Sequence, residues 1–166
     1  IVKDTRATYI TFADDEIGIN KKQLIEMCEV FVRRGNKIPW GCNVVASTLS
    51  DDILKAMWAA GCRDLWIGVE TGSPKIMEQV QKPITVDIVK SAFRRAKDIG
   101  FSRRAYFLLG MPDEGWEDIK ATEQLVEDIQ PAVGGFTILA PYPGTFFYDP
   151  KLHSHVDWSE VDEYQN

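Results

Sequence analysis

The sequence predicts an α/β fold in which short buried strands alternate with amphipathic helices. Five apolar runs are rich in β-branched or aromatic residues and short enough to be buried strands, at 7–13, 38–45, 64–69, 104–109 and 135–140. Four stretches with helical periodicity separate these runs. Because parallel strands need long crossover connections, we expect five parallel strands joined mainly by helices.

The first two strands are each followed by a helix with recognisable ends. Asn20 can cap the first helix, Gln23 completes a capping box, and Gly35 can end it. Ser50 can cap the second helix and Gly61 can end it. The inward-facing residues that we expect are Leu24, Cys28, Phe31 and Val32 on the first helix, and Ile53, Leu54, Met57 and Trp58 on the second.

Two further helices follow the third and fourth strands. A short helical turn is expected after Pro74, and a longer helix begins at Thr85 and ends before Gly100. Another runs from about Trp116 and is closed by Pro131. The expected inward residues are Ile88, Val89, Ala92, Phe93 and Ala96, then Ile119, Thr122, Leu125, Val126 and Ile129.

Two arrangements of five parallel strands fit this pattern: a doubly wound sheet, or a β/α barrel or part of one. Periodicity alone does not choose between them. Both arrangements place ligands at the carboxyl ends of the strands. The residues that directly follow each strand are therefore the candidates for chemistry.

Composition and charge indicate a globular protein and disfavour nucleic acid as its partner. The 166 residues include 25 acidic and 19 basic side chains, which gives a formal net charge of −6. An acidic surface disfavours nucleic acid, and no apolar run is long enough to span a membrane. The arginine pairs at 33–34, 94–95 and 103–104 are scattered, as expected for solvated helix ends and loops.

The number and spacing of the cysteines favour free thiols over disulfide bonds or a metal site. Cys28, Cys42 and Cys62 are odd in number and widely spaced. We expect free thiols in or near the core, which indicates a cytoplasmic location. His153 and His155 lie in a polar segment and not at a strand end, so no metal site is predicted there.

Polar residues follow the first three strands. Asp14 and Asp15 could bind a cation or an ammonium group, or form a charged loop. Asn43 could face a ligand or hydrogen-bond a turn. Glu70 ends a buried strand, where a carboxylate is costly unless it is paired or used, so it could bind hydroxyl groups or pair with a neighbouring lysine or arginine.

The last two strands lead into loops that expose backbone. Gly110, Met111 and Pro112 form a turn whose amides and carbonyls could bind the edge of a flat heterocycle, or merely reverse the chain. Ala140 and Pro141 begin a proline-rich loop, which suits ligand recognition and chain reversal equally.

Taken together, these segments resemble the radical S-adenosylmethionine (SAM) superfamily, and within it the group that includes anaerobic magnesium-protoporphyrin monomethyl ester cyclases. The matching segments cover about residues 7–145 in the order found in the family: Phe12-Ala13-Asp14-Asp15, Trp58-Ala59-Ala60-Gly61-Cys62, Ile67-Gly68-Val69-Glu70-Thr71-Gly72-Ser73, Lys82-Pro83-Ile84-Thr85, Leu109-Gly110-Met111-Pro112-Asp113-Glu114 and Pro141-Tyr142-Pro143-Gly144-Thr145.

The resemblance implies a partial TIM-like (β/α)6 barrel, of which this chain would supply the second to sixth strands. Residues 1–147 would form the incomplete barrel domain and 148–166 a polar tail or linker. The first strand and the family's CxxxCxxC motif would precede Ile1, since no such motif occurs here. This chain would then be a fragment that holds no [4Fe–4S] cluster and is inactive alone.

The resemblance also assigns SAM-binding residues at the strand ends. Asp14 and Asp15 match the acidic position near the methionyl amine, Glu70 the position near the ribose, and the 110–112 turn the stretch beside the adenine. The other implied contacts come from Asn43, Thr71, Ala140 and Pro141.

The activity implied for the intact protein is reductive cleavage of SAM to a 5′-deoxyadenosyl radical, which abstracts hydrogen from an organic small molecule such as a tetrapyrrole. The reaction would be of the cyclase, oxidoreductase or methyltransferase type. Flavodoxin or ferredoxin would supply the electron, and an upstream domain could bind cobalamin. The alternatives are a barrel-derived scaffold without radical chemistry, and an aldolase-like barrel, for which no convincing lysine or metal site is found at a strand end.

Overall fold

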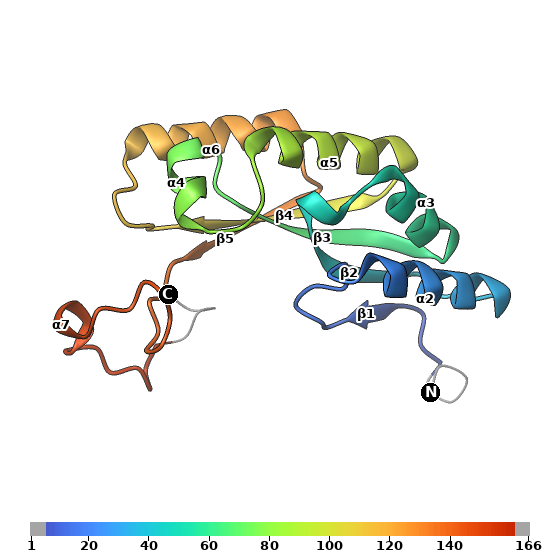
Figure 1. The fold of residues 1–166 in the computed structure, drawn as a ribbon, viewed down its shortest axis with the longest axis horizontal. Helices are drawn as coiled ribbons and strands as arrows, with labels where there is room; N and C mark the ends of the chain where they lie inside the picture. The colour runs from blue at the N-terminus through green and yellow to red at the C-terminus, as the bar shows by residue number, and fades with distance from the viewer. Residues whose placement is uncertain (1–5, 162–166) are drawn as a thin grey trace.

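The computed structural model describes residues 6–161 and contains one five-stranded parallel sheet (Figure 1). The strands pair in sequential order, β1-β2-β3-β4-β5, so the predicted parallel arrangement is confirmed and a doubly wound sheet is ruled out. Their bounds are Ile10–Phe12 for β1, Trp40–Val45 for β2, Cys62–Glu70 for β3, Ser102–Leu109 for β4 and Val133–Ile138 for β5.

The four long helices all cover the same face of the sheet (Figure 1). They are α2 (Lys21–Arg33), α3 (Asp51–Ala59), α5 (Val86–Ile99) and α6 (Trp116–Ile129). Three short helical segments complete the described chain: η1 (Ala46–Thr48), α4 (Pro74–Gln79) and α7 (Pro150–His153). The turn after Pro74 was expected, whereas η1 and α7 were not. Among the described helices, none is both long and apolar enough to cross a membrane.

The core lies between the sheet and the helices because alternate residues of β2, β3 and β4 point toward the helices. Trp40, Cys42, Leu65, Ile67 and Phe107 face the helices and are completely or almost completely buried. The residues between them face the opposite side of the sheet, and except for the buried Gly41 they remain partly accessible. The sheet therefore has one apolar face and one open face.

The helix starts largely agree with the sequence signals. The Asn20 side chain accepts a hydrogen bond from the Gln23 amide at 3.1 Å, and Thr85 caps α5 in the same way. Ser50 occupies the cap position of α3, but its side chain makes no capping hydrogen bond. The expected inward position of Val32 is wrong, since this side chain is 52% exposed.

The expectation that every arginine pair is solvated is also wrong for the third pair. Arg103 lies on the helix-facing side of β4, where its Nη1 donates to the Ile129 carbonyl at 3.1 Å. Burial lowers the pKa of the Arg103 guanidinium. Arg104 points to the opposite, open face. Consecutive strand residues face opposite sides of a sheet, so Arg103 and Arg104 lie in different environments.

The polar segment after 147 contains more structure than expected. The rings of Tyr148, His153 and Trp158 contact one another, with centroid separations of 5.7–6.3 Å. His153 Nδ1 accepts a hydrogen bond from the Asp149 amide at 3.1 Å. The proposed boundary at 147 stays a prediction, and the acidic residues Asp162 and Glu163 lie outside the described residues.

A close approach between the end of β3 and α6 depends on Gly72. A Cβ atom at this position would lie only 2.2 Å from the Ala121 carbonyl oxygen and 2.6 Å from the Thr122 Cα. The Gly72 amide donates to Thr122 Oγ1 at 2.9 Å. The glycine therefore lets the β3–α4 connection dock directly on the α6 backbone.

We expect Gly72→Ala to lower the free energy of unfolding by about 1 to 3 kcal/mol, because the methyl group forces the connection away from α6. Chemical denaturation followed by circular dichroism measures the change. Gly115→Ala is the control, since a Cβ there would meet no atom closer than 3.8 Å. Equal stabilities of the two variants would contradict the proposed close packing.

Asp118 joins the starts of α4 and α6. Its carboxylate accepts hydrogen bonds from the Ser73 hydroxyl at 2.5 Å and the Gly115 amide at 2.9 Å, and pairs with Lys75 at 3.2 Å. These interactions, the Ser73 hydrogen bond foremost, lower the pKa of Asp118 to about 2. The unfolded chain therefore binds this proton more tightly than the folded chain does.

The stabilisation from Asp118 should be complete above about pH 4 and disappear as the pH falls to about 2. We expect Asp118→Asn to lower stability at pH 7 and to flatten its decline between these pH values. Urea midpoints at pH 7, 4, 3 and 2 measure this. Glu123→Gln, an exposed change on the same helix, should follow the unmodified chain; a parallel decline in Asp118→Asn would refute the linkage.

Candidate functional site

The carboxyl ends of the five strands form one rim, and most of the predicted site residues end a strand or follow one, whereas Asn43 lies within β2. Asp14 and Asp15 follow β1, and Glu70 is the last residue of β3. The 110–112 turn follows β4, and Ala140 and Pro141 follow β5. Because the strands are parallel, these segments meet at the same edge of the sheet although they are far apart in sequence.

Asn43 fixes the loop that carries the two aspartates. Its Nδ2 donates to the Asp14 carbonyl at 3.2 Å, and its own carbonyl accepts from the Ile17 amide at 3.2 Å. The Asp14 and Asp15 side chains are exposed. A cavity of about 450 Å³ lies beside this loop, with Asp14 in its wall. The amide of Asn43 therefore acts on the loop backbone and leaves both carboxylates available.

Glu70 forms an ion pair with Lys82. Its backbone has a φ of +68°, and its carboxylate folds over Gly68, where a Cβ atom would lie 2.8 Å from Oε1. Of the two expectations for Glu70, pairing with a neighbouring lysine is the one that the structure contains. A carboxylate has about four lone-pair sites, so the pair with Lys82 leaves acceptor capacity for a further donor.

The loop after β4 is held by its own side chains and by α4. Glu114 Oε2 accepts from the Gly110 amide at 2.6 Å, and Gln79 donates to the Pro112 carbonyl at 3.0 Å. Lys75 donates to the Asp113 carbonyl at 2.5 Å. The Met111 side chain is buried, so this residue can offer only backbone atoms to a ligand.

Thr71 does not lie at the rim with the other candidates. Its side chain is buried, its hydroxyl oxygen lies 3.2 Å from that of Thr122, and it accepts from the Ser73 amide at 3.1 Å. These interactions direct the hydroxyl toward α6. The expected contact of Thr71 with a cofactor stays a prediction, and in this structure its side chain supports the β3–α4 connection.

The loop after β5 is anchored to its neighbour. The Leu139 amide donates to the Leu109 carbonyl at 2.8 Å, and the Tyr142 amide donates to the Ala140 carbonyl at 2.9 Å. Ala140 and Pro141 are half-buried. The Tyr142 ring lies 5.5 Å from that of Trp158, so the polar segment packs against this part of the rim.

The open face of the sheet carries a second group of side chains, of which the sequence analysis named Asn43 but missed Trp66, Arg104 and Tyr106. Asn43, Trp66 and Arg104 lie in register on β2, β3 and β4. Tyr106 is two residues further along β4, and its ring lies over Gly135, where a Cβ atom would be 2.9 Å away. Strict alternation with buried neighbours is the sequence signal that could have found these residues.

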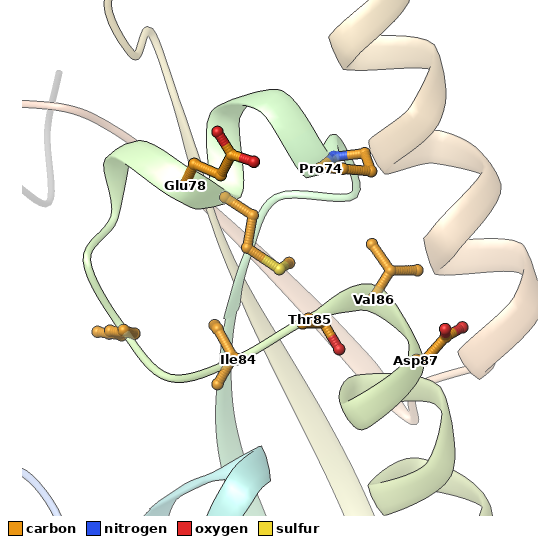
Figure 2. A pocket seen from close by; sticks show the side chains of 8 residues that line it. Pro74, Glu78, Ile84, Thr85, Val86 and Asp87 are labelled. Atoms are coloured by element: carbon orange, nitrogen blue, oxygen red, sulfur yellow. The ribbon is translucent and has the colours of Figure 1, made fainter.

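A further cavity of about 420 Å³ lies outside the rim, between α4 and the start of α5 (Figure 2). Pro74, Ile84 and Val86 supply apolar walls, while Glu78 and Asp87 are the carboxylates around it. Lys82 also lines this cavity and connects it to Glu70.

The cysteines do not form a metal site. All three are free and buried on the helix-facing side, away from the open face, and burial raises the pKa of the Cys28 thiol to about 11. Burial, together with a hydrogen bond to Cys42, also raises the pKa of Cys62. Within residues 6–161, no group of three His, Cys, Asp or Glu side chains is arranged to hold a metal ion. These thiols therefore do not fit the ligand set of an iron–sulfur cluster.

Comparisons with known proteins agree with this architecture. Residues 1–126 match the sequence model of the radical SAM superfamily. An uncharacterised methyltransferase of Pyrococcus horikoshii is 33% identical over 89% of this chain and 32% of its own length. The anaerobic magnesium-protoporphyrin IX monomethyl ester cyclase of Rubrivivax gelatinosus is 28% identical over 99% of this chain and 30% of its own length. The chain thus spans about a third of these relatives.

Solved structures show the same fold at low sequence identity. A radical SAM methyltransferase from Kitasatospora setae, with cobalamin and a [4Fe–4S] cluster bound, has a TM-score of 0.77 at 20% identity, over 85% of this chain and 30% of that one. The coproporphyrinogen III oxidase of Escherichia coli has a TM-score of 0.70 at 19% identity, over 82% of this chain and 33% of that one.

The five parallel strands form part of a radical SAM barrel, and the sequence match covers most of the chain. This chain belongs to the radical SAM superfamily.

Proposed function

We propose that this chain binds SAM along the rim and is part of an enzyme that cleaves SAM reductively and abstracts hydrogen from an organic small molecule. The observation that carries the proposal is the rim itself: available carboxylates after β1, a carboxylate at the end of β3 and firmly held backbone after β4 all lie on one edge.

Each segment of the rim suits a different part of SAM. Asp14 and Asp15 complement the methionyl ammonium group, since carboxylates form strong charge-assisted hydrogen bonds with it. Glu70 accepts from the ribose hydroxyls with the lone pairs that Lys82 leaves. The backbone of the 110–112 turn faces the adenine edge, while Ala140 and Pro141 close the far end. Asn43 contributes by holding the Asp14 loop in place.

When it receives one electron, SAM supplies methionine and a 5′-deoxyadenosyl radical through cleavage of its sulfonium C–S bond. The residues of this chain position the nucleoside and exclude water, and the difficult chemistry belongs to the cofactors. Because Cys28, Cys42 and Cys62 do not fit a cluster, we propose that the [4Fe–4S] ligands come from another part of the protein. Flavodoxin or ferredoxin would supply the electron.

The relatives support a reaction of the methyltransferase or cyclase type, with cobalamin as a further cofactor bound outside this chain. A tetrapyrrole substrate is compatible with the cyclase relatives. The rim geometry is common to both reaction types, because it concerns SAM and not the substrate.

Removing the charge of Glu70 tests the ribose contact. We expect Glu70→Gln to weaken SAM binding by roughly tenfold, because a hydrogen bond to a charged acceptor is lost. Equilibrium dialysis with labelled SAM measures affinity. Glu78→Gln, in the cavity outside the rim, is the matched control.

Lys82→Met separates ligand binding from stability. If Glu70 serves only to pair with Lys82, Glu70→Gln and Lys82→Met will lower the thermal midpoint equally and leave SAM affinity unchanged. That result would count against the ribose assignment.

Reconstitution tests the source of the cluster. After anaerobic incubation with iron and sulfide, we expect the 166-residue chain to show no stable cluster absorbance and, with dithionite, no 5′-deoxyadenosine. The longer protein that contains this chain should gain both properties. Cluster formation by the chain alone would contradict the assignment, and an inert longer protein would favour a scaffold without radical chemistry.

A further inference from the structure

The open face of the sheet has polar side chains at mid-depth, below the rim. Within residues 6–161, no helix covers this face (Figure 1). Trp66 and Arg104 are directly paired in the β3–β4 register, and Asn43 is paired with Trp66 on the other side. Leu65, Ile67, Arg103 and Ala105 are buried against the helices, so Trp66 and Arg104 face the open side.

Two donors in this row lack acceptors. Within the described residues, the indole Nε1–H of Trp66 and the Nε–H of Arg104 are enclosed but make no hydrogen bond. The Arg104 guanidinium carbon lies 5.7 Å from the centre of the Trp66 ring, so the two groups adjoin. Enclosed donors without partners are costly, and an incoming acceptor would remove that cost.

The acids above and below this row pair with residues other than Arg104. Asp64 lies one row below and accepts from the Tyr9 hydroxyl at 2.6 Å; burial and this hydrogen bond raise the pKa of Tyr9. Glu70, at the rim above, pairs with Lys82. Among residues 6–161, no ion pair involves Arg104. The open face therefore has a cation available at mid-depth.

An aromatic surface adjoins this cation. The Tyr106 side chain is 41% exposed, and its ring is supported from beneath by Gly135. A glycine at this position leaves the room that the Tyr106 ring occupies, and the exposed part of the ring is available to a ligand. Planar apolar groups pack well on such a face.

We propose that Trp66, Arg104 and Tyr106 form the substrate-recognition surface of the barrel, and that it selects an aromatic or other planar compound bearing a carboxylate. The Arg104 guanidinium donates to the carboxylate beside the adjoining Trp66 indole, and Tyr106 packs against the planar body. The role of this surface as a substrate site rests on the proposed function. Its binding of a planar carboxylate does not.

The test uses 2-naphthoate as the probe and 2-naphthalenemethanol as its uncharged counterpart. Titration of the ¹⁵N-labelled chain is followed by NMR at the indole N–H signals, and the signal absent from Trp66→Phe belongs to Trp66. We expect 2-naphthoate to shift this signal and to bind roughly tenfold more tightly than the alcohol, because charge-assisted hydrogen bonds are the stronger kind.

Charge-matched variants separate specific recognition from general attraction. Arg104→Gln should weaken 2-naphthoate binding roughly tenfold, while Arg94→Gln, an exposed change on α5, should not. Should Arg104→Gln not fold, Arg104→Lys keeps the charge but lacks the planar fork, and should also weaken binding. Tyr106→Leu should weaken the acid and the alcohol equally.

Absence of 2-naphthoate binding, or equal affinity in Arg104→Gln and Arg94→Gln, would overturn the proposal. Titration of the same variants with SAM keeps the two proposals apart. Arg104→Gln should not alter SAM affinity, and Glu70→Gln should not alter 2-naphthoate affinity. Failure of SAM to bind, with Arg104-dependent binding of 2-naphthoate intact, would refute the rim assignment and not this one.

Discussion

One-sided burial of the parallel sheet is the constraint on which the rest of the structure depends. All four long helices pack on one face, so the residues of β2, β3 and β4 that face them are buried and mostly apolar. The intervening residues are free to be polar because nothing in the described chain covers them. Trp40, Leu65 and Phe107 therefore belong to the core, while Asn43, Trp66 and Arg104 are left on the open side.

The rim is assembled by contacts between neighbouring strand ends. Asn43 within β2 holds the loop after β1, and Lys82 reaches back to Glu70 at the end of β3. The loop after β4 is held by Lys75 and Gln79 of α4. Side chains of neighbouring elements therefore hold each strand end and loop in place. The carboxylates and backbone atoms of the rim are fixed before a ligand binds. Such preorganisation lowers the entropic cost of binding a flexible cofactor.

The two proposed binding sites lie at different levels along the same strands. The rim would bind SAM, and the row at Trp66 and Arg104 would recognise the carboxylate of the substrate. Adjacent levels on the same strands are only a few residues apart, so a substrate held there would lie near the nucleoside. Specificity and radical generation could thus change independently, because different residues of the same strands carry them.

The sequence by itself determined the five strands, the four long helices and their order, because periodicity and terminal signals are local properties. It also placed Asp14, Glu70 and Gly110 at strand ends. Only the tertiary structure decided which partners those residues meet. The ion pair of Glu70 with Lys82, the burial of Thr71 against Thr122 and the contrast between Arg103 and Arg104 depend on side-chain direction and on distant elements. Local patterns carry no such information, since two positions far apart in sequence become neighbours only when the sheet forms.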